Sequence, residues 1–278
     1  GTDEAALEKL QRCMREATVE DLDIGYAYEM EPEIDGEGGF LPRPLEELHP
    51  RDNMPVLRGK PNLLQGTIYP AYRDFNETSF EAEYQNFLGY IHYEGMPANI
   101  KQVIHDFNLD DLEKDDPFYW IYSAYKLHDL KWAERLINEV VAWVRVDRNP
   151  QVYIYRGDYG YDFMFEGTGV PENRRYTTHA WETAFLYASG REFDVDYPEL
   201  STKDRDFLGM ASDMVVNFVK FGDPTPDTGE WLPATPDETL RYYSLKPQPQ
   251  MKDAYEPRAA ALWHQVIPSL FRSGKKSG

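Results

Sequence analysis

Histidine is the side chain in this sequence best suited to take up and return a proton near neutral pH. The chain has six, namely His49, His92, His105, His128, His179 and His264. A histidine base acts on a nucleophile, but none of the nine serines has glycines two residues to either side, so the elbow that presents a catalytic serine is absent. The sequence also lacks a phosphate-binding loop, a dinucleotide fingerprint and a His-Glu-x-x-His motif. Residue types alone therefore favour a structural or surface role for each histidine.

The other reactive side chains carry less information. With 49 Asp and Glu residues, acidic pairs occur by chance. Cys13 lies within a predicted helix, where a structural role is favoured over a nucleophilic one. A single cysteine also excludes a disulfide framework and a Cys-based zinc site within this chain. We therefore predict no cofactor and no metal.

Composition narrows the class of partner. The formal net charge of −20 argues against nucleic acid and against anionic membrane surfaces, both of which need clustered Lys and Arg. The charge could steer a cationic ligand, although a self-repelling surface is the simpler interpretation. Hydrophobic residues make up 41% of the chain, which is enough for a core, and no apolar run reaches transmembrane length.

Helices and strands alternate along the chain. Apolar spacing predicts helices at 4–16, 97–107, 201–220 and 257–271, and two helices within 116–147. Ser201 and Asp204 have the spacing of a helix cap, Thr18 and Asp21 could open another short helix, and Pro257 suits a first helical position. Loops are expected at 31–44 and 157–178, which are rich in Gly and Pro.

Strands are few. We predict a short buried strand at 54–59, a central strand at 151–156 and a last strand at 240–245. The expected fold class is α/β, with few sheet strands and large helical layers. Three strands are too few for a self-sufficient α/β domain of 278 residues, so N-terminal strands are expected to be missing.

Several segments, read in order, resemble the carboxylesterase–cholinesterase family. Those near the start are Leu10-Gln-Arg-Cys13, Val19-Glu-Asp-Leu22, Glu33-Ile-Asp-Gly36, Phe40-Leu-Pro42 and Pro44-Leu-Glu-Glu-Leu48. Those further on are Met54-Pro-Val-Leu-Arg-Gly59, Val152-Tyr-Ile-Tyr155, His179-Ala-Trp-Glu182, Phe221-Gly-Asp-Pro224, Trp231-Leu-Pro233 and Leu262-Trp263 through Pro268. The resemblance covers nearly the whole chain. It implies that residues 1–278 form a single domain, the C-terminal part of an α/β-hydrolase whose nucleophile elbow is absent.

The family uses a serine, an acid and a histidine in that order along the chain. His179 matches the family's histidine, which takes the proton of the serine. The family's acid is a glutamate directly before a glycine. Here Gln65-Gly66 stands at that point, and the alignment could slip to Leu64, so neither choice supplies a carboxylate. Another carboxylate could fill in, with Asp74, Glu77 and Glu182 as candidates by proximity in sequence.

Three functions follow from the resemblance. The chain could belong to an impaired or non-catalytic carboxylesterase-like protein, as Gln65 favours, because a lost acid charge costs about 10⁴ in turnover. It could instead be part of an active serine carboxylic-ester hydrolase, as the retained His179 favours. It could also belong to a cholinesterase-like adhesion or recognition protein. A stand-alone α/β domain related only by descent would need more strands.

The resemblance also implies partners and location. The expected partners are the N-terminal portion of the same protein and, through the apolar stripe of the 257–271 helix, a second copy; packing of that stripe on its own domain is equally open. Cys13 is expected to be a free thiol, because the family's upstream partner cysteine is not in this chain. The family mostly follows the secretory route, and Asn76-Glu-Thr78 is a glycosylation sequon compatible with it.

Overall fold

The computed structural model describes residues 4–18, 34–43, 54–61, 74–90, 96–109, 111–145, 151–177, 181–187 and 200–274. It divides the chain into two compact units, Gly1–Leu48 and His49–Gly278. In the first unit, helix α1 (Glu4–Glu16) confirms the predicted helix, and Leu7, Leu10 and Met14 are about half exposed along it. Residues 34–43 form turns, as expected of a Gly-rich loop. The short helix predicted after Thr18 lies outside the described residues.

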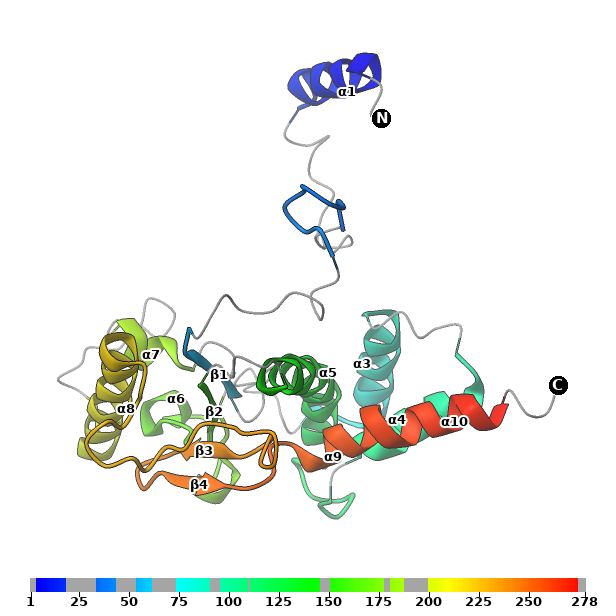
Figure 1. The fold of residues 1–278 in the computed structure, drawn as a ribbon. Coiled ribbons are helices and arrows are strands. Elements are labelled where there is room, and N and C mark those ends of the chain that lie inside the picture. Colours follow the sequence, from blue (N-terminus) through cyan, green and yellow to red (C-terminus); the bar gives the residue numbers. More distant parts are fainter. Residues whose placement is uncertain are drawn as a thin grey trace. The chain divides into compact units, whose positions relative to one another are not determined.

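The second unit is built on a mixed sheet of the order β1-β2-β3-β4 (Figure 1). The strands are β1 (Val56–Pro61), β2 (Val152–Gly157), β3 (Tyr242–Leu245) and β4 (Gln250–Lys252). The first three strands are parallel, and β4 pairs antiparallel with β3. β2 is therefore central, as its Tyr and β-branched content predicts.

Helices account for more than half of the described residues of the second unit. Its helical segments are α3 (Glu77–Tyr90), α4 (Ala98–Asn108), α5 (Tyr119–Val144), α6 (Asp162–Phe165), the 3₁₀ turn η4 (Glu172–Arg174), α7 (Thr183–Tyr187), α8 (Thr202–Phe221), α9 (Pro257–Ala261), the π-helical turn η6 (Leu262–Val266) and α10 (Ile267–Gly274). The predictions for α4, α8 and the closing helical segment are confirmed, including Pro257 at the first helical turn.

Four predictions about elements need correction. Residues 116–147 contain one helix, α5, and not two, because 119–144 holds neither Gly nor Pro to interrupt it. The strand expected at 54–59 runs from Val56 to Pro61 and is only partly buried: Arg58 is exposed, and within the described sheet the strand lies at the edge, beside β2. The last strand is β4, whose residues Gln250, Met251 and Lys252 pair with β3 but are too few to show a strand pattern. The loop at 157–178 contains the short helical segments α6 and η4.

The two faces of the sheet pack against different helices. On one face, Val152 and Ile154 of β2 and Tyr242 of β3 pack against the C-terminal half of α5. On the other, Tyr153 and Tyr243 pack with α8. Side chains of a strand alternate between the faces, so each strand takes part in both layers. The sheet thus lies between α5 and α8 (Figure 1).

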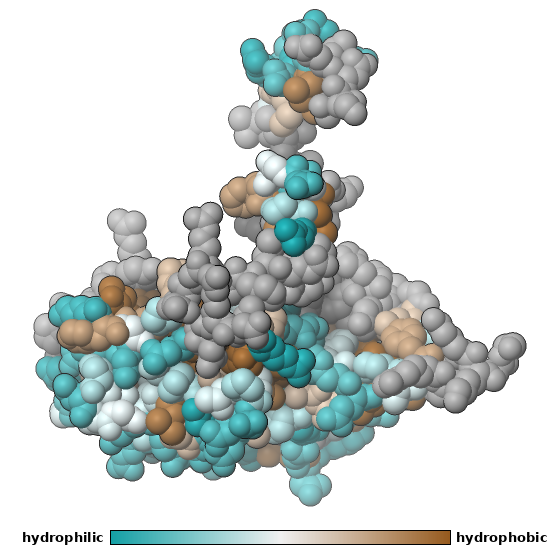
Figure 2. Space-filling view, viewed as in Figure 1, coloured by the Kyte–Doolittle hydropathy of each residue, from teal (hydrophilic) through white to brown (hydrophobic). Residues whose placement is uncertain are grey.

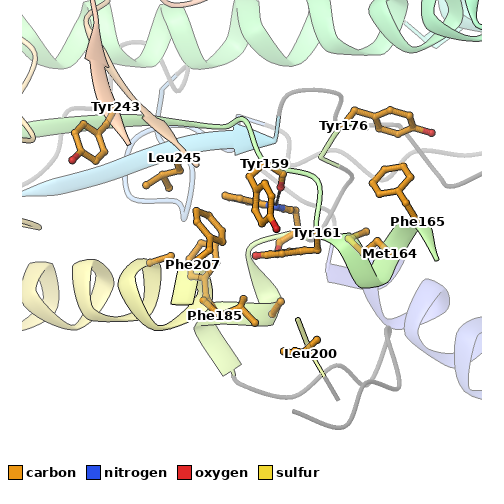
Figure 3. Close-up of a cluster of buried hydrophobic side chains, with 14 of the residues drawn as sticks. Tyr159, Tyr161, Met164, Phe165, Tyr176, Phe185, Leu200, Phe207, Tyr243 and Leu245 are labelled. Atoms are coloured by element: carbon orange, nitrogen blue, oxygen red, sulfur yellow. Dashed lines mark hydrogen bonds between the residues drawn. The ribbon is translucent and has the colours of Figure 1, made fainter. Parts of the chain in front are cut away.

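Aromatic rings fill the layer between the sheet and α8. Trp231 stacks on Tyr243 with ring centroids 4.8 Å apart, and the ring of Tyr159 lies edge-on to Phe207 at 5.0 Å. Figure 3 shows Tyr159 and Tyr161 beside Phe207 of α8. Such edge and offset contacts stabilise aromatic pairs beyond the area they bury. The segment after β2 is thereby fixed to α8.

On the face drawn in Figure 2, the described residues of the second unit are mostly hydrophilic, with scattered hydrophobic ones. No helix among the described residues has the length and apolarity needed to cross a membrane.

Candidate functional site

His179 and Gln65, the two site residues predicted from sequence, both lie outside the described residues. The structure does describe the strands that precede them. β1 and β2 are parallel neighbours, with Pro61 opposite Gly157 at their carboxyl ends. Ligands and catalytic groups of open α/β sheets gather at this edge. The chain therefore leaves both strands at the edge where such sites form.

The residues on either side of 178–180 are anchored to the end of β2. The hydroxyl of Thr177 donates a hydrogen bond of 2.8 Å to the carbonyl of Gly157, and the indole Nε1 of Trp181 donates one of 2.7 Å to the carbonyl of Tyr159. Both side chains are fully buried. Gly157 is required here, because a Cβ at this position would lie 2.8 Å from the Trp181 ring. These contacts hold both ends of the short segment that carries His179.

Glu182 differs from the other carboxylates proposed to replace the missing acid. Asp74 and Glu77 are exposed, whereas Glu182 is half-buried and its Oε2 atom is buried without a hydrogen-bond partner among the described residues. A buried carboxylate oxygen without a donor is costly. Burial and then the charge of Glu182 raise the pKa of Tyr155 of β2.

A partly buried ion-pair network lies on the face of these strand ends opposite Tyr155. Lys60 of β1, only 5% exposed, lies 3.4 Å from a carboxylate oxygen of Asp129 and 3.5 Å from one of Glu256. Arg156 of β2 also contacts Glu256 at 3.5 Å and Asp158 at 2.7 Å. Because Lys60 and Arg156 pair directly across the two parallel strands, the shared Glu256 connects both strands to the start of α9.

No motif or spacing in the sequence predicted this network. The signal in the sequence was the occurrence of Lys60 at the end of β1 and of Arg156 in β2, since a charge needs a partner when it is buried. The carboxylate partners are separated from these residues by up to 196 positions in the sequence, so motif spacing does not identify them. The network supports the edge of the sheet and offers no nucleophile.

The described part of the chain contains no group of three or more His, Cys, Asp or Glu side chains arranged to hold a metal ion. Cys13 is exposed on α1.

The fold is that of the α/β-hydrolases. It is similar to the juvenile hormone esterase of Manduca sexta, solved with OTFP covalently attached, with a TM-score of 0.56 and 14% identity over 78% of this chain and 42% of that one. The family model for the carboxylesterase family matches residues 3–263. This chain belongs to the carboxylesterase family.

Two curated relatives are esterases of nematodes. The chain is 24% identical to gut esterase 1 of Caenorhabditis elegans over 166 residues, which is 60% of this chain and 26% of that protein. It is 29% identical to gut esterase 1 of Caenorhabditis briggsae over 132 residues, which is 46% of this chain and 22% of that protein. The chain thus spans about a quarter of the length of the curated relatives it matches.

Proposed function

We propose that this chain is the C-terminal part of a longer carboxylesterase-like protein, with His179 as the base of an ester-hydrolase triad and Gln65 in place of the acid. The observation that carries the proposal is the anchoring of Thr177 and Trp181 on both sides of His179. A histidine base needs this support, because proton transfer depends on a fixed position of its ring. Family membership and the short span of the relatives' length agree with it.

The reaction assigns His179 two proton transfers. A serine from the preceding part of the protein would attack the ester carbonyl, and His179 would take its proton and pass it to the leaving alcohol. Water would then release the acyl group through the same two steps. In each step the imidazole becomes an imidazolium, whose charge a neighbouring carboxylate stabilises.

We propose that this stabilisation is weak here. Gln65 can accept a hydrogen bond from the imidazole but brings no negative charge, and its amide can also present NH₂, so the tautomer of His179 is less firmly set. Loss of the acid's charge costs about 10⁴ in turnover in a serine triad. The expected protein is an impaired or non-catalytic esterase, and a recognition protein with the same fold is its limiting case.

A second candidate function is an active ester hydrolase in which Glu182 supplies the charge. The buried Oε2 of Glu182, with no hydrogen-bond donor among the described residues, favours it. Glu182 is three residues from His179, close enough in sequence to act on its imidazole. The two candidates differ in which substitution changes activity.

The test is labelling of the full-length protein with a fluorophosphonate, which reacts with an activated serine. We expect slow labelling of the wild type and labelling faster by about 10²-fold or more in Gln65→Glu, because the carboxylate restores the charge. Glu182→Gln should leave the wild-type rate unchanged. Fast labelling of the wild type that is lost in Glu182→Gln would favour the second candidate over the first. No labelling of the wild type or of either variant would favour a recognition protein.

We also propose that the protein follows the secretory route. The family resemblance and the sequon at Asn76 support this. The protein in the medium of expressing cells, compared with the protein in the cytosol, tests it.

A further inference from the structure

Asn76-Glu-Thr78 is the one Asn-x-Ser/Thr sequon in the sequence, and neither the middle residue nor Ser79 is a proline. In the structure all three sequon residues are exposed, immediately before and at the start of α3. We propose that Asn76 carries an N-linked glycan. The proposal rests on the proposed secretory route and is independent of ester hydrolysis.

The side chain of Asn76 also caps α3, and the two roles use different atoms. Its Oδ1 accepts hydrogen bonds from the backbone N–H of Ser79 at 3.2 Å and from the Ser79 hydroxyl at 3.5 Å. The backbone N–H of Phe80 bonds to the Asn76 carbonyl at 2.9 Å, which begins the helical ladder. A glycan bonds to Nδ2, so the capping oxygen stays in place after modification.

The hydrogen bond that Nδ2 makes is a weak one. The atom's contact is a 3.4 Å hydrogen bond to the backbone carbonyl of Asp74, which is longer than the usual range for an N–H···O hydrogen bond. After glycosylation the amide keeps one N–H, which can maintain this bond. The modification therefore costs no capping contact.

Packing of α3 leaves room for the sugar. Phe80, Tyr84, Phe87 and Leu88 are buried in a cluster with α4, α5 and the closing helices. Asn76, Glu77 and Thr78 lie outside that cluster and are exposed. A glycan on Asn76 would extend into solvent and displace no core side chain.

The reaction is a glycosyl transfer from a polyprenyl-diphosphate-linked oligosaccharide to the amide nitrogen. The bond between Nδ2 and sugar C1 forms, the bond between C1 and the diphosphate oxygen breaks, and Nδ2 gives up one proton. The acceptor sequence requires the hydroxyl of Thr78, which Ser can replace and Ala cannot.

The test is the intact mass of the full-length protein from a secreting eukaryotic cell, before and after treatment with a peptide N-glycosidase. This enzyme converts a glycosylated asparagine to aspartate. We expect the wild type and Thr78→Ser to lose mass, with aspartate appearing at position 76 in the tryptic peptide. Thr78→Ala and Asn76→Asp should show no change.

The two glycan-free variants separate modification from folding. Asn76→Asp keeps a capping oxygen and Thr78→Ala keeps Asn76, so both should retain the thermal unfolding midpoint of the enzymatically deglycosylated wild type. A wild-type peptide with unmodified Asn76 overturns the proposal, whether the protein is secreted or retained in the cytosol. The fluorophosphonate result does not depend on this outcome, so failure here leaves the proposed hydrolase site intact.

Discussion

At the scale of single residues, His105 lies between two carboxylates. Its Nε2 is 2.7 Å from Glu81 of α3 and its Nδ1 is 3.0 Å from Asp106, while the rings of Phe80 and Tyr84 lie edge-on to it. Burial lowers the pKa of His105, but its hydrogen bonds to the carboxylates of Asp106 and Glu81, together with their charges, outweigh burial and raise that pKa above 6.5. A protonated His105 therefore joins α3 to α4.

This geometry predicts a pH-dependent contribution to stability. Because the folded pKa of His105 is raised above the unfolded value, the contribution is complete below about pH 6.5 and is lost as pH rises through the folded pKa. The difference in free energy of unfolding between wild type and His105→Gln should be larger at about pH 6 than at about pH 9. Urea denaturation at the two pH values measures it, and equal differences would contradict the contribution of the charged form.

At the scale of elements, Asp204 connects α8 to the segment after β2 through hydrogen bonds. Its backbone N–H donates to the Ser201 hydroxyl at 3.0 Å, which confirms the predicted cap. Its buried carboxylate accepts hydrogen bonds from the Tyr159 hydroxyl at 2.6 Å and from the backbone N–H groups of Asp162 and Phe163. Burial, reinforced by this carboxylate, raises the pKa of Tyr159 and keeps its hydroxyl as a donor.

Substitution of Asp204 should therefore lower the free energy of unfolding by more than loss of a helix cap does. Asp204→Asn places an NH₂ group against N–H and O–H donors, and we expect a loss of about 2 kcal/mol or more in free energy of unfolding. Ser201→Ala removes the cap alone and should cost about 1 kcal/mol. Urea denaturation of both variants compares them. Equal losses would mean that the contacts of the Asp204 carboxylate contribute little.

At the scale of the whole molecule, the closing helices could join two copies of the protein. Most of their apolar stripe packs on their own unit: Leu262 and Ile267 are buried, and Trp263 donates a hydrogen bond to the carbonyl of Leu130. Phe271 of α10 remains 43% exposed. A homodimer through 257–271 would therefore centre on Phe271.

The mass of the full-length protein in solution tests this expectation. We expect a dimer for the wild type and a monomer for Phe271→Asp, because a charge in an apolar contact is costly. Val216→Asp on α8, where the side chain is 42% exposed, is the matched control and should remain dimeric. Light scattering after gel filtration measures the mass, and a wild-type monomer would contradict the dimer.

The sequence by itself determined the local elements and the family. Apolar spacing predicted α1, α4 and α8, and the spacing of Ser201 and Asp204 predicted the cap, because periodicity and capping act within a few residues. Tyr and β-branched content predicted the central position of β2. Ordered motifs gave the carboxylesterase family, which the match over residues 3–263 confirms. The roles of His179 and Gln65 stay predictions, since both lie outside the described residues.

The tertiary structure decided which distant residues meet. Lys60 and Arg156 both contact Glu256, and the Tyr159 hydroxyl donates a hydrogen bond to the carboxylate of Asp204. Oε2 of Glu182 is buried without a hydrogen-bond partner among the described residues. No local pattern encodes these pairs, because a buried charge is stabilised by groups that reach it through the fold and not through neighbouring sequence.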